Sequence, residues 1–320
     1  MPSNLESMNY PYNEMKLNKV FKNKDINLPT LGIDCNELRK VYGEALMFGE
    51  IPKDRPYTYS SLVTSIDGRI AFTDDPEGPL IASKNFLSKL GSTTDWWTLN
   101  ILRSSADGII FGANTLSAEP NGTGHVYDNN LEKARELLGR ESVPWNIIPT
   151  LDGSDIPFDH IQFTCGEVPI IFYTSPAGLK TCKKNAKKET IIIGPYNTTE
   201  EIIFKDFIPD KNKVYIIVTG ENNIPNNKVG LKILRKMGIE KLLVESPTLT
   251  HIFMEEELMD ELFLNYSCVY LGGKSLTMGM HGKEFTSTNH PHTELISIFM
   301  YSPHYMYLRH KVIYGVYQNV

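Results

Sequence analysis

Residues 58–71, TYSSLVTSIDGRIA, join a strand to an abrupt turn. The β-branched, aromatic and hydroxyl residues from Thr58 to Ile66 are typical of a buried strand. Asp67 and Gly68 then interrupt the apolar character, which resumes at Ile70. Asp-Gly is a common tight-turn dipeptide, so turn chemistry is one explanation of this carboxylate. A functional carboxylate at the end of a strand is the other.

Helical and strand-like segments alternate from residue 55 onward. The stretch STTDWWTLNILRSSA (92–106) predicts a helix that Ser92 and Asp95 open at capping-box spacing. Residues 229–237 and 247–259 also have helical patterns. Short apolar runs ended by turn residues predict buried strands at 57–65, 107–112, 146–150, 169–175, 190–194, 213–220 and 241–246.

The C-terminal part ends the alternation. Strand patterns occur at 261–273, 294–302 and 306–317, and no helical pattern separates the last two. Such an ending predicts antiparallel strands at one side of the sheet. The sequence therefore predicts a three-layer α/β fold, with a mainly parallel sheet, helices on both faces and antiparallel C-terminal strands.

The first 54 residues differ from the rest in composition. They are rich in Asn and Lys and contain one amphipathic patch, NELRKVYGEALMF (36–48), that predicts a short helix. We interpret residues 1–54 as an N-terminal arm and residues 55–320 as a single domain. Within that domain, the segment around residues 120–143 is expected to be an insertion over one edge.

Charge and hydropathy exclude several classes of partner. The net charge of -6 gives no basic footprint for nucleic acid. No apolar run approaches the roughly 18 residues of a membrane span, and the polar N-terminus does not resemble a signal peptide. We therefore expect a cytoplasmic protein that binds neither nucleic acid nor membrane.

Metal binding is not expected either. The four cysteines are far apart in the sequence and include no Cys-x-x-Cys pair. The only dense group of histidines lies after residue 280, around HPH (290–292), and no carboxylate or cysteine stands there at ligand spacing.

The ends of the predicted strands carry most of the residues suited to ligand binding. In parallel α/β sheets, ligands bind at the carboxyl ends of the strands. Hydroxyl groups and glycines cluster there, and such residues suit the recognition of phosphate. The clusters are SIDG (65–68), FGANT (111–115), PTLDG (149–153), YTS (173–175), VESPT (244–248) and LGGKS (271–275). For each residue taken singly, ordinary turn or capping chemistry is the alternative.

The order of these motifs resembles a known family. The motifs are RPYTYSSLVTSIDGRIA (55–71), LRSSADGIIFGANTL (102–116), GIEKLLVESPTLTHIFMEEELMDELFLNY (238–266) and LGG (271–273). In this order they are similar to the C-terminal reductase domain of bifunctional riboflavin-biosynthesis proteins, a domain with the dihydrofolate reductase fold. The resemblance extends over roughly residues 55–317. The zinc-deaminase signature of the other half of those proteins is not found.

The resemblance implies an NADPH-dependent reductase. Members of the family transfer hydride to the sugar C1 of a ribosylated pyrimidine, which turns a ribosylamino group into a ribitylamino group. The resemblance places Asp67 in the catalytic role, facing a heterocyclic substrate, where a carboxylate helps to move a proton. Homodimers are common in this family, so we expect one here.

The resemblance also implies two sets of binding residues. The cofactor set is Gly112, Thr115, Thr150, Thr174, Ser175, Ser246 and Thr248. The substrate set is Ser65, Asp67, Glu119, Glu245, Gly272 and Gly273.

Two departures from the family pattern bear on these roles. VESPT (244–248) stands where the family has Val-Glu-Gly-Gly before Pro-Thr-Leu, so Ser246 and Thr248 with a helix N-terminus would have to bind the pyrophosphate. SAEPNGTGH (117–125) keeps Glu119 but lacks the family's arginine.

Two alternatives to this function stay open. One is a non-catalytic scaffold that binds a nucleotide or a partner protein, and the other is a dihydrofolate reductase-like activity. Cofactor titration separates the first from an NADPH-dependent reductase, and methotrexate-sensitive turnover of dihydrofolate would identify the second.

Overall fold

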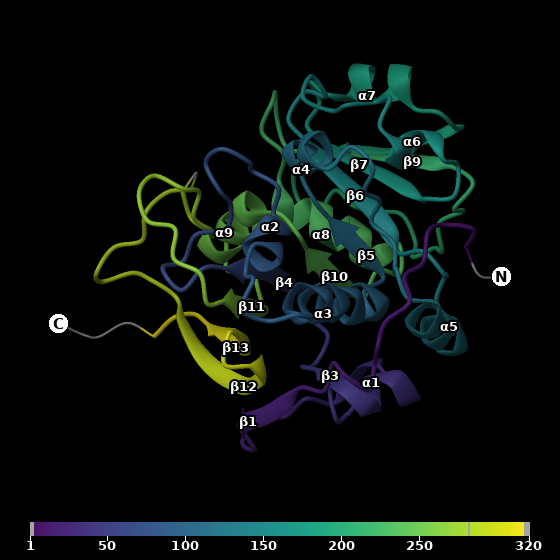
Figure 1. Cartoon of the computed structure of the whole chain (residues 1–320). Helices are drawn as coiled ribbons and strands as arrows, with labels where there is room; N and C mark the ends of the chain where they lie inside the picture. Colours follow the sequence, from purple (N-terminus) through teal and green to yellow (C-terminus); the bar gives the residue numbers. More distant parts are fainter. Residues whose placement is uncertain (1–2, 281, 317–320) are drawn as a thin grey trace.

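The computed structural model describes residues 3–280 and 282–316, and an eleven-stranded sheet runs through them (Figure 1). In spatial order the strands are β1 (Asn18–Lys22), β12 (His292–Ser302), β13 (Tyr305–Ile313), β11 (Glu261–Ser267), β4 (Tyr57–Thr64), β10 (Lys241–Val244), β5 (Gly108–Ile110), β6 (Trp145–Thr150), β7 (Ile170–Thr174), β9 (Val214–Thr219) and β8 (Thr190–Tyr196). Neighbouring strands from β11 to β8 in this order are parallel. The three remaining pairs, β11–β13, β13–β12 and β12–β1, are antiparallel. The predicted sheet is confirmed, except that the strand expected over 261–273 ends at Ser267.

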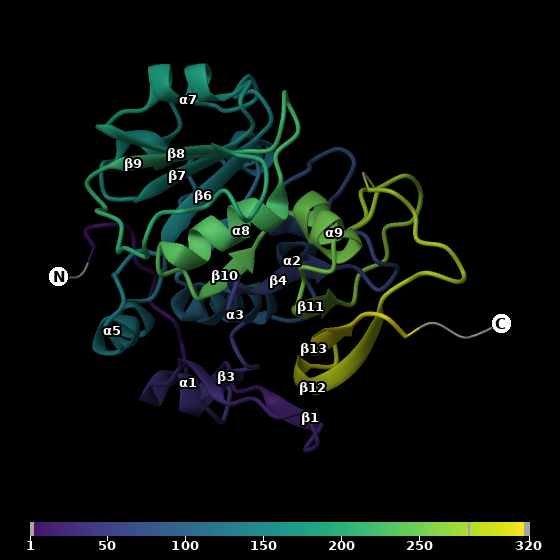
Figure 2. The same ribbon diagram turned by 180° about the vertical axis from the view of Figure 1, so that it is seen from behind.

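Helices cover both faces of this sheet (Figures 1 and 2). One face carries α8 (Asn227–Lys236) and α9 (Pro247–Glu255). The other carries α1 (Asn36–Val41), α2 (Leu80–Ser83), α3 (Gly91–Ser105), α4 (Ala113–Ala118), α5 (Asn129–Leu137), α6 (Ile161–Thr164) and α7 (Leu179–Asn185). The fold is therefore the expected three-layer α/β architecture.

Burial on both faces explains the continuous apolar runs of the central strands. Every residue of β7 and β9 is buried. Phe172 and Ile216 belong to the hydrophobic cluster under α3, whereas their chain neighbours Ile171 and Ile217 belong to the cluster under α8. A strand buried on both sides gains from apolar residues at every position rather than at alternate ones.

The start of α3 differs from the prediction. The helix begins at Gly91, and Ser92 lies inside it, so the predicted capping box was wrong. A Cβ atom on Gly91 would clash with the Tyr305 ring, so glycine allows the helix to approach β13 closely. Asp95 is buried and accepts a hydrogen bond from Nδ2 of Asn265 at 2.9 Å.

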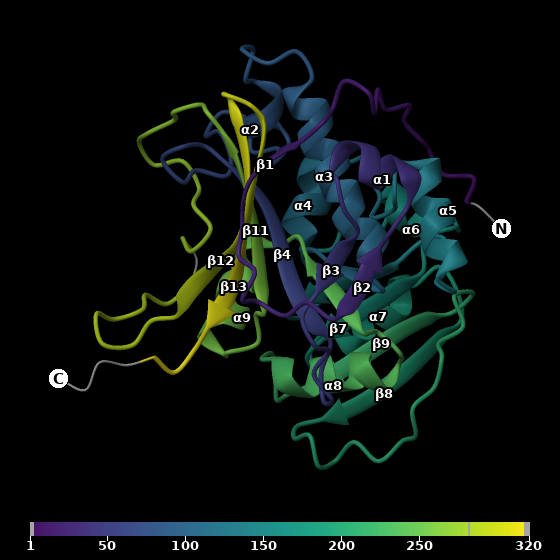
Figure 3. The same ribbon diagram turned by 90° about the horizontal axis from the view of Figure 1, so that it is seen from below.

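The N-terminal segment is integrated into the fold at the sheet edge. Strand β1 pairs with β12, and Figure 3 shows it beside the C-terminal strands. The predicted helix within 36–48 is shorter than its pattern, because α1 ends at Val41 and residues 46–48 form β3 (Leu46–Phe48), which pairs with β2 (Thr30–Ile33). Leu38 and Phe48 are fully buried in the cluster under α3. The division into an arm and a domain stays a prediction.

Candidate functional site

The carboxyl edge of the sheet has a step at its centre. Val244, the last residue of β10, pairs with both Ser60 of β4 and Ile110 of β5. Strand β4 continues from Ser60 to Thr64, and β6 continues beyond Ile147, the partner of Ile110, to Thr150. The two central strands therefore end earlier than their neighbours. We call this feature the central step, and topology favours the ends of parallel strands as a ligand site.

A buried ion pair lies at the central step. Glu245 directly follows β10, and Arg103 of α3 donates to it through Nε at 2.8 Å and Nη2 at 2.7 Å. Although burial by itself lowers the pKa of Arg103, Glu245 raises that pKa above its ordinary value. Nη1 of Arg103 donates to two backbone oxygens, those of Thr123 and His125. The guanidinium is thus fixed in place and holds Glu245.

Glu119 lies near this pair but is not bonded to it. Neither of its carboxylate oxygens makes a hydrogen bond to a residue that the structure describes. Burial raises its pKa, the nearby Arg103 opposes that shift, and Glu245 adds to it. A partly buried carboxyl group without an internal partner is suited to bind a donor group of a ligand.

Two helices begin beside the central step. Gly112 precedes α4, and Ser246 caps α9 by accepting a hydrogen bond from the backbone N–H of Leu249 at 3.3 Å. A Cβ atom on Gly112 would lie 3.9 Å from Oγ of Ser246, so the two helix starts are neighbours. Thr115 and Thr248 lie in the first turns of these helices. The structure thus brings four residues of the predicted cofactor set together.

The remaining three residues of that set are engaged with nearby parts of the chain. Thr150 and Thr174 are cross-strand partners on β6 and β7. Oγ1 of Thr150 donates to Asp155 at 2.6 Å, and Oγ of Ser175 donates to the backbone oxygen of Leu151 at 2.7 Å. Oγ1 of Thr174 donates to the same backbone oxygen at 3.3 Å. Ordinary loop capping explains these contacts, and a role in cofactor binding stays a prediction.

Asp67 joins two loops instead of standing free. Its carboxylate accepts hydrogen bonds from Oγ of Ser65 at 2.6 Å and from the backbone N–H groups of Leu271 and Gly272 at 3.2 and 2.8 Å. The bond from Ser65 is the main cause that lowers the pKa of Asp67 to about 2. The turn beneath it needs glycine, because Gly68 has a φ of +75°. The carboxylate is therefore ionised at neutral pH, which favours an anchoring role over proton transfer.

Gly272 and Gly273 have φ values of +71° and +60°, and they form the loop that Asp67 holds. Sequence reasoning did not detect that loop's attachment to Asp67, because the two segments are about 200 residues apart.

Trp96 and Trp97 are adjacent in α3 but differ in burial. Trp97 is fully buried, whereas Trp96 is partly exposed. The Arg103 guanidinium carbon lies 5.4 Å from the centre of the Trp96 ring. The seven-residue spacing of Trp96 and Arg103 along one helix face was the signal that could have linked the two.

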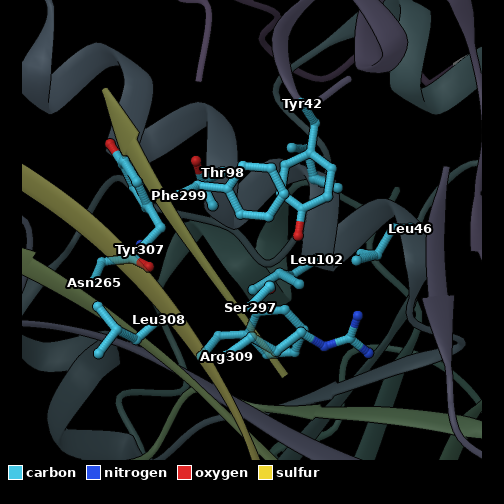
Figure 4. A pocket seen from close by; sticks show the side chains of 12 residues that line it. Tyr42, Leu46, Thr98, Leu102, Asn265, Ser297, Phe299, Tyr307, Leu308 and Arg309 are labelled. Carbon is cyan, nitrogen blue, oxygen red and sulfur yellow. The ribbon is translucent and has the colours of Figure 1, made fainter. Parts of the chain in front are cut away.

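A small cavity lies elsewhere, between the N-terminal segment and the antiparallel strands (Figure 4). Tyr42 and Phe299 stack at its wall with ring centres 4.2 Å apart. Its volume is about 20 Å³, which is space for one water molecule and not for a nucleotide. Its lining residues come from the N-terminal segment, α3 and the strands β11, β12 and β13, so the cavity is distinct from the central step. Among the described residues, which exclude His281, no group of three or more side chains is arranged to hold a metal ion.

The mainly parallel sheet with antiparallel C-terminal strands and helices on both faces has the architecture of the dihydrofolate reductase type. Residues 56–307 match the model of the RibD C-terminal domain family. The chain belongs to this family of riboflavin-biosynthesis reductases, which confirms the resemblance found in its sequence.

Individual relatives agree with this assignment. The chain is 22% identical over 233 residues to the 2,5-diamino-6-ribosylamino-4(3H)-pyrimidinone 5′-phosphate reductase of Archaeoglobus fulgidus, a match that covers 72% of this chain and 89% of the relative.

Two solved structures share the fold. A pyrimidine reductase-like protein from Corynebacterium diphtheriae is 19% identical with a TM-score of 0.57, and the match covers 84% of this chain and 97% of that one. RibD from Acinetobacter baumannii is 16% identical with a TM-score of 0.53, and the match covers 81% of this chain. The chain spans only 59% of the length of that RibD protein.

Proposed function

We propose that the protein is an NADPH-dependent reductase whose substrate is a ribosylaminopyrimidine 5′-phosphate. The family match supports the reaction class, and the name of the A. fulgidus relative supplies the substrate class. The observation that carries the proposal is Glu119, a partly buried carboxyl group beside a fixed Arg103–Glu245 pair, with no hydrogen bond to a residue within 3–280 and 282–316. The amino groups of a diaminopyrimidine are donors of the kind that such a group accepts.

The residues around the central step have only some of the features expected of a dinucleotide-binding site. Two adjacent helix starts, at Gly112 and Ser246, present backbone N–H groups of the kind that bind phosphate. Against this, Oγ of Ser246 already caps its own helix. Bound NADPH supplies the hydride. We propose that Ser246 and Thr248 hold its pyrophosphate, with Thr115, Thr150, Thr174 and Ser175 on the same side.

The reaction also needs a proton. Opening of the sugar ring gives a C1=N bond, and its reduction adds a hydride to C1 and a proton to the nitrogen. Asp67 is a poor source of that proton because its pKa is about 2. The pKa of Glu119 is raised by burial, so its protonated form persists to higher pH than that of an exposed glutamate. We propose that Glu119 donates this proton. We also propose that the substrate site is lined by Ser65, Glu245, Gly272 and Gly273.

Glu119→Gln tests this assignment. If Glu119 supplies the proton, kcat falls roughly a hundredfold or more, because general acid catalysis of this kind contributes about that much. The wild-type rate then declines as pH rises through the pKa of Glu119, and the variant lacks this decline. Glu14→Gln, at an exposed glutamate, is the matched control. An unchanged pH profile in the Glu119 variant would remove Glu119 from the reaction.

Measurement of cofactor binding separates the alternatives. Micromolar binding of NADPH followed by fluorescence, with NADH alongside, supports the reductase. Absence of binding at millimolar cofactor would leave the scaffold alternative, and turnover of dihydrofolate would favour the dihydrofolate reductase-like one.

We also propose a homodimer and a cytoplasmic location. On the sheet face opposite α3, Leu264 and Ile298 flank Leu308, and Tyr266 and Met300 flank Met306. These side chains are all partly exposed, so a second copy could cover them. The cytoplasm keeps free thiols such as Cys268 reduced.

A further inference from the structure

Two loops at the carboxyl edge pair with each other along their length. Residues 65–73 follow β4, and residues 268–277 follow the adjacent β11. The backbone N–H of Ile66 donates to Val269 at 3.0 Å, and that of Ile70 donates to Leu276 at 2.9 Å. We call these two segments the paired loops. Because β4 borders the central step, the paired loops form the side of the candidate site next to that strand.

The Asp67 carboxylate lies between the paired loops and binds to both. Its oxygens accept the backbone N–H groups of Leu271 and Gly272, on the second loop, and the Ser65 hydroxyl, on the first. Arg69 reinforces the joint, because its Nη1 donates to the backbone oxygen of Ser275 at 3.0 Å and its Nε lies 3.6 Å from Oδ2 of Asp67. Among the described residues, every polar contact of this carboxylate is thus to one of the two loops.

One feature of the adjoining strand end points toward a ligand. Oγ1 of Thr64 is buried and has no hydrogen-bond partner within residues 3–280 and 282–316. Buried hydroxyl groups are rarely left without a partner. Thr64 is the last residue of β4 and directly precedes the first paired loop.

We propose that Asp67 is a positioning residue that fixes residues 268–277 against residues 65–73 and thereby shapes the substrate side of the site. This inference rests on the proposed reductase function for its kinetic consequence but not for its structural one. The carboxylate acts through the loop it holds. Its loss loosens the contact between the paired loops but leaves Glu119, the proposed source of the proton, in place.

The test compares three variants. Asp67→Asn keeps the shape but loses the charge and one of the two acceptor oxygens, because the amide nitrogen that replaces it can only donate. Ser65→Ala removes one donor and leaves the carboxylate intact, so it remains informative if Asp67→Asn folds poorly. Asp74→Asn changes an exposed carboxylate in the segment just beyond the first loop and is the matched control.

Hydrogen exchange of the purified protein gives a readout that does not depend on activity. We expect the amides of residues 269–277 to lose protection roughly tenfold or more in Asp67→Asn, less in Ser65→Ala and not in Asp74→Asn. Protection equal to that of the wild type in Asp67→Asn would overturn the proposal, whether or not the protein proves to be a reductase.

Steady-state kinetics separate positioning from catalysis. A positioning role predicts that Asp67→Asn raises KM for the pyrimidine roughly tenfold, changes kcat little and keeps the pH profile. A fall of kcat by roughly a hundredfold or more, with an altered pH profile and unchanged exchange, would instead make Asp67 a catalytic residue. If the wild type oxidises no NADPH, the proposed function fails and the exchange result still decides the role of the joint.

Discussion

Three carboxyl groups show how surroundings set the charge of single residues in this protein. Asp67 accepts several hydrogen bonds and has a lowered pKa, whereas burial raises the pKa values of Glu119 and Asp95. The sequence predicted Asp67 and Glu119 as candidate site residues but did not predict their protonation, because protonation depends on contacts from distant segments. It also failed to predict that Asp95, at an expected capping position, would be buried.

Asp95 gives a prediction for stability. Burial raises its pKa from 3.8 to about 7, so the folded state binds this proton more tightly than the unfolded state. The stabilisation is therefore complete below pH 3.8 and is lost as pH rises through about 7.

Asp95→Asn, which resembles the protonated acid, should be more stable than the wild type at pH 8 by about 1–4 kcal/mol. The difference should shrink toward pH 4. Denaturant unfolding at several pH values measures it, with Asp74→Asn as the control. A wild-type protein whose stability does not fall between pH 4 and pH 8 relative to Asp95→Asn would contradict the account.

At the scale of elements, hydrophobic patterning predicted the buried strands and missed the exposed strand at the sheet edge. The strands β7 and β9 were predicted because burial on both faces makes their whole length apolar. Strand β1 was missed because all five of its residues are exposed at the sheet edge. Its partner β12 lies about 280 residues further along, and no local pattern indicates that pairing.

The contact between α3 and β13 gives a prediction at this scale. Gly91→Ala places a Cβ atom against the Tyr305 ring, so the helix must shift. We expect a loss of about 1–3 kcal/mol in unfolding free energy, the usual cost of overpacking. Gly78→Ala is the matched control, because no atom lies within 4 Å of its added Cβ. Equal stability of the two variants in thermal unfolding would refute this close packing.

At the scale of the whole molecule, the sheet topology places the candidate site and the proposed dimer face in separate regions. Leu308 lies on the uncovered face of the antiparallel strands, away from the central step. Leu308→Glu should therefore convert a dimer to a monomer in light scattering, because it puts a charge into an apolar contact. Val20→Glu, at an exposed position on β1, should leave the dimer intact. A monomeric wild type, or a dimeric Leu308→Glu variant that remains folded, would exclude this interface.

The family and the fold class followed from the sequence, because the motifs stand at strand ends in a fixed order. The sequence did not predict which side chains at those strand ends are already hydrogen-bonded within the protein. Ser175 and Thr150 match the pattern of ligand-binding hydroxyl groups, yet both are bonded to neighbouring loops in the structure. A motif predicts which residue stands at the end of a strand. Whether its side chain is free to bind a ligand depends on the contacts that the surrounding loops make.

The most direct test of the account is the oxidation of NADPH by the purified wild-type protein with the proposed ribosylaminopyrimidine phosphate as substrate. The account predicts substrate-dependent loss of NADPH absorbance and formation of the ribitylamino product. It also predicts that Glu119→Gln reduces this rate far more than Glu14→Gln does. A protein that binds NADPH but leaves both compounds unchanged, or that binds no NADPH at millimolar concentration, would contradict it.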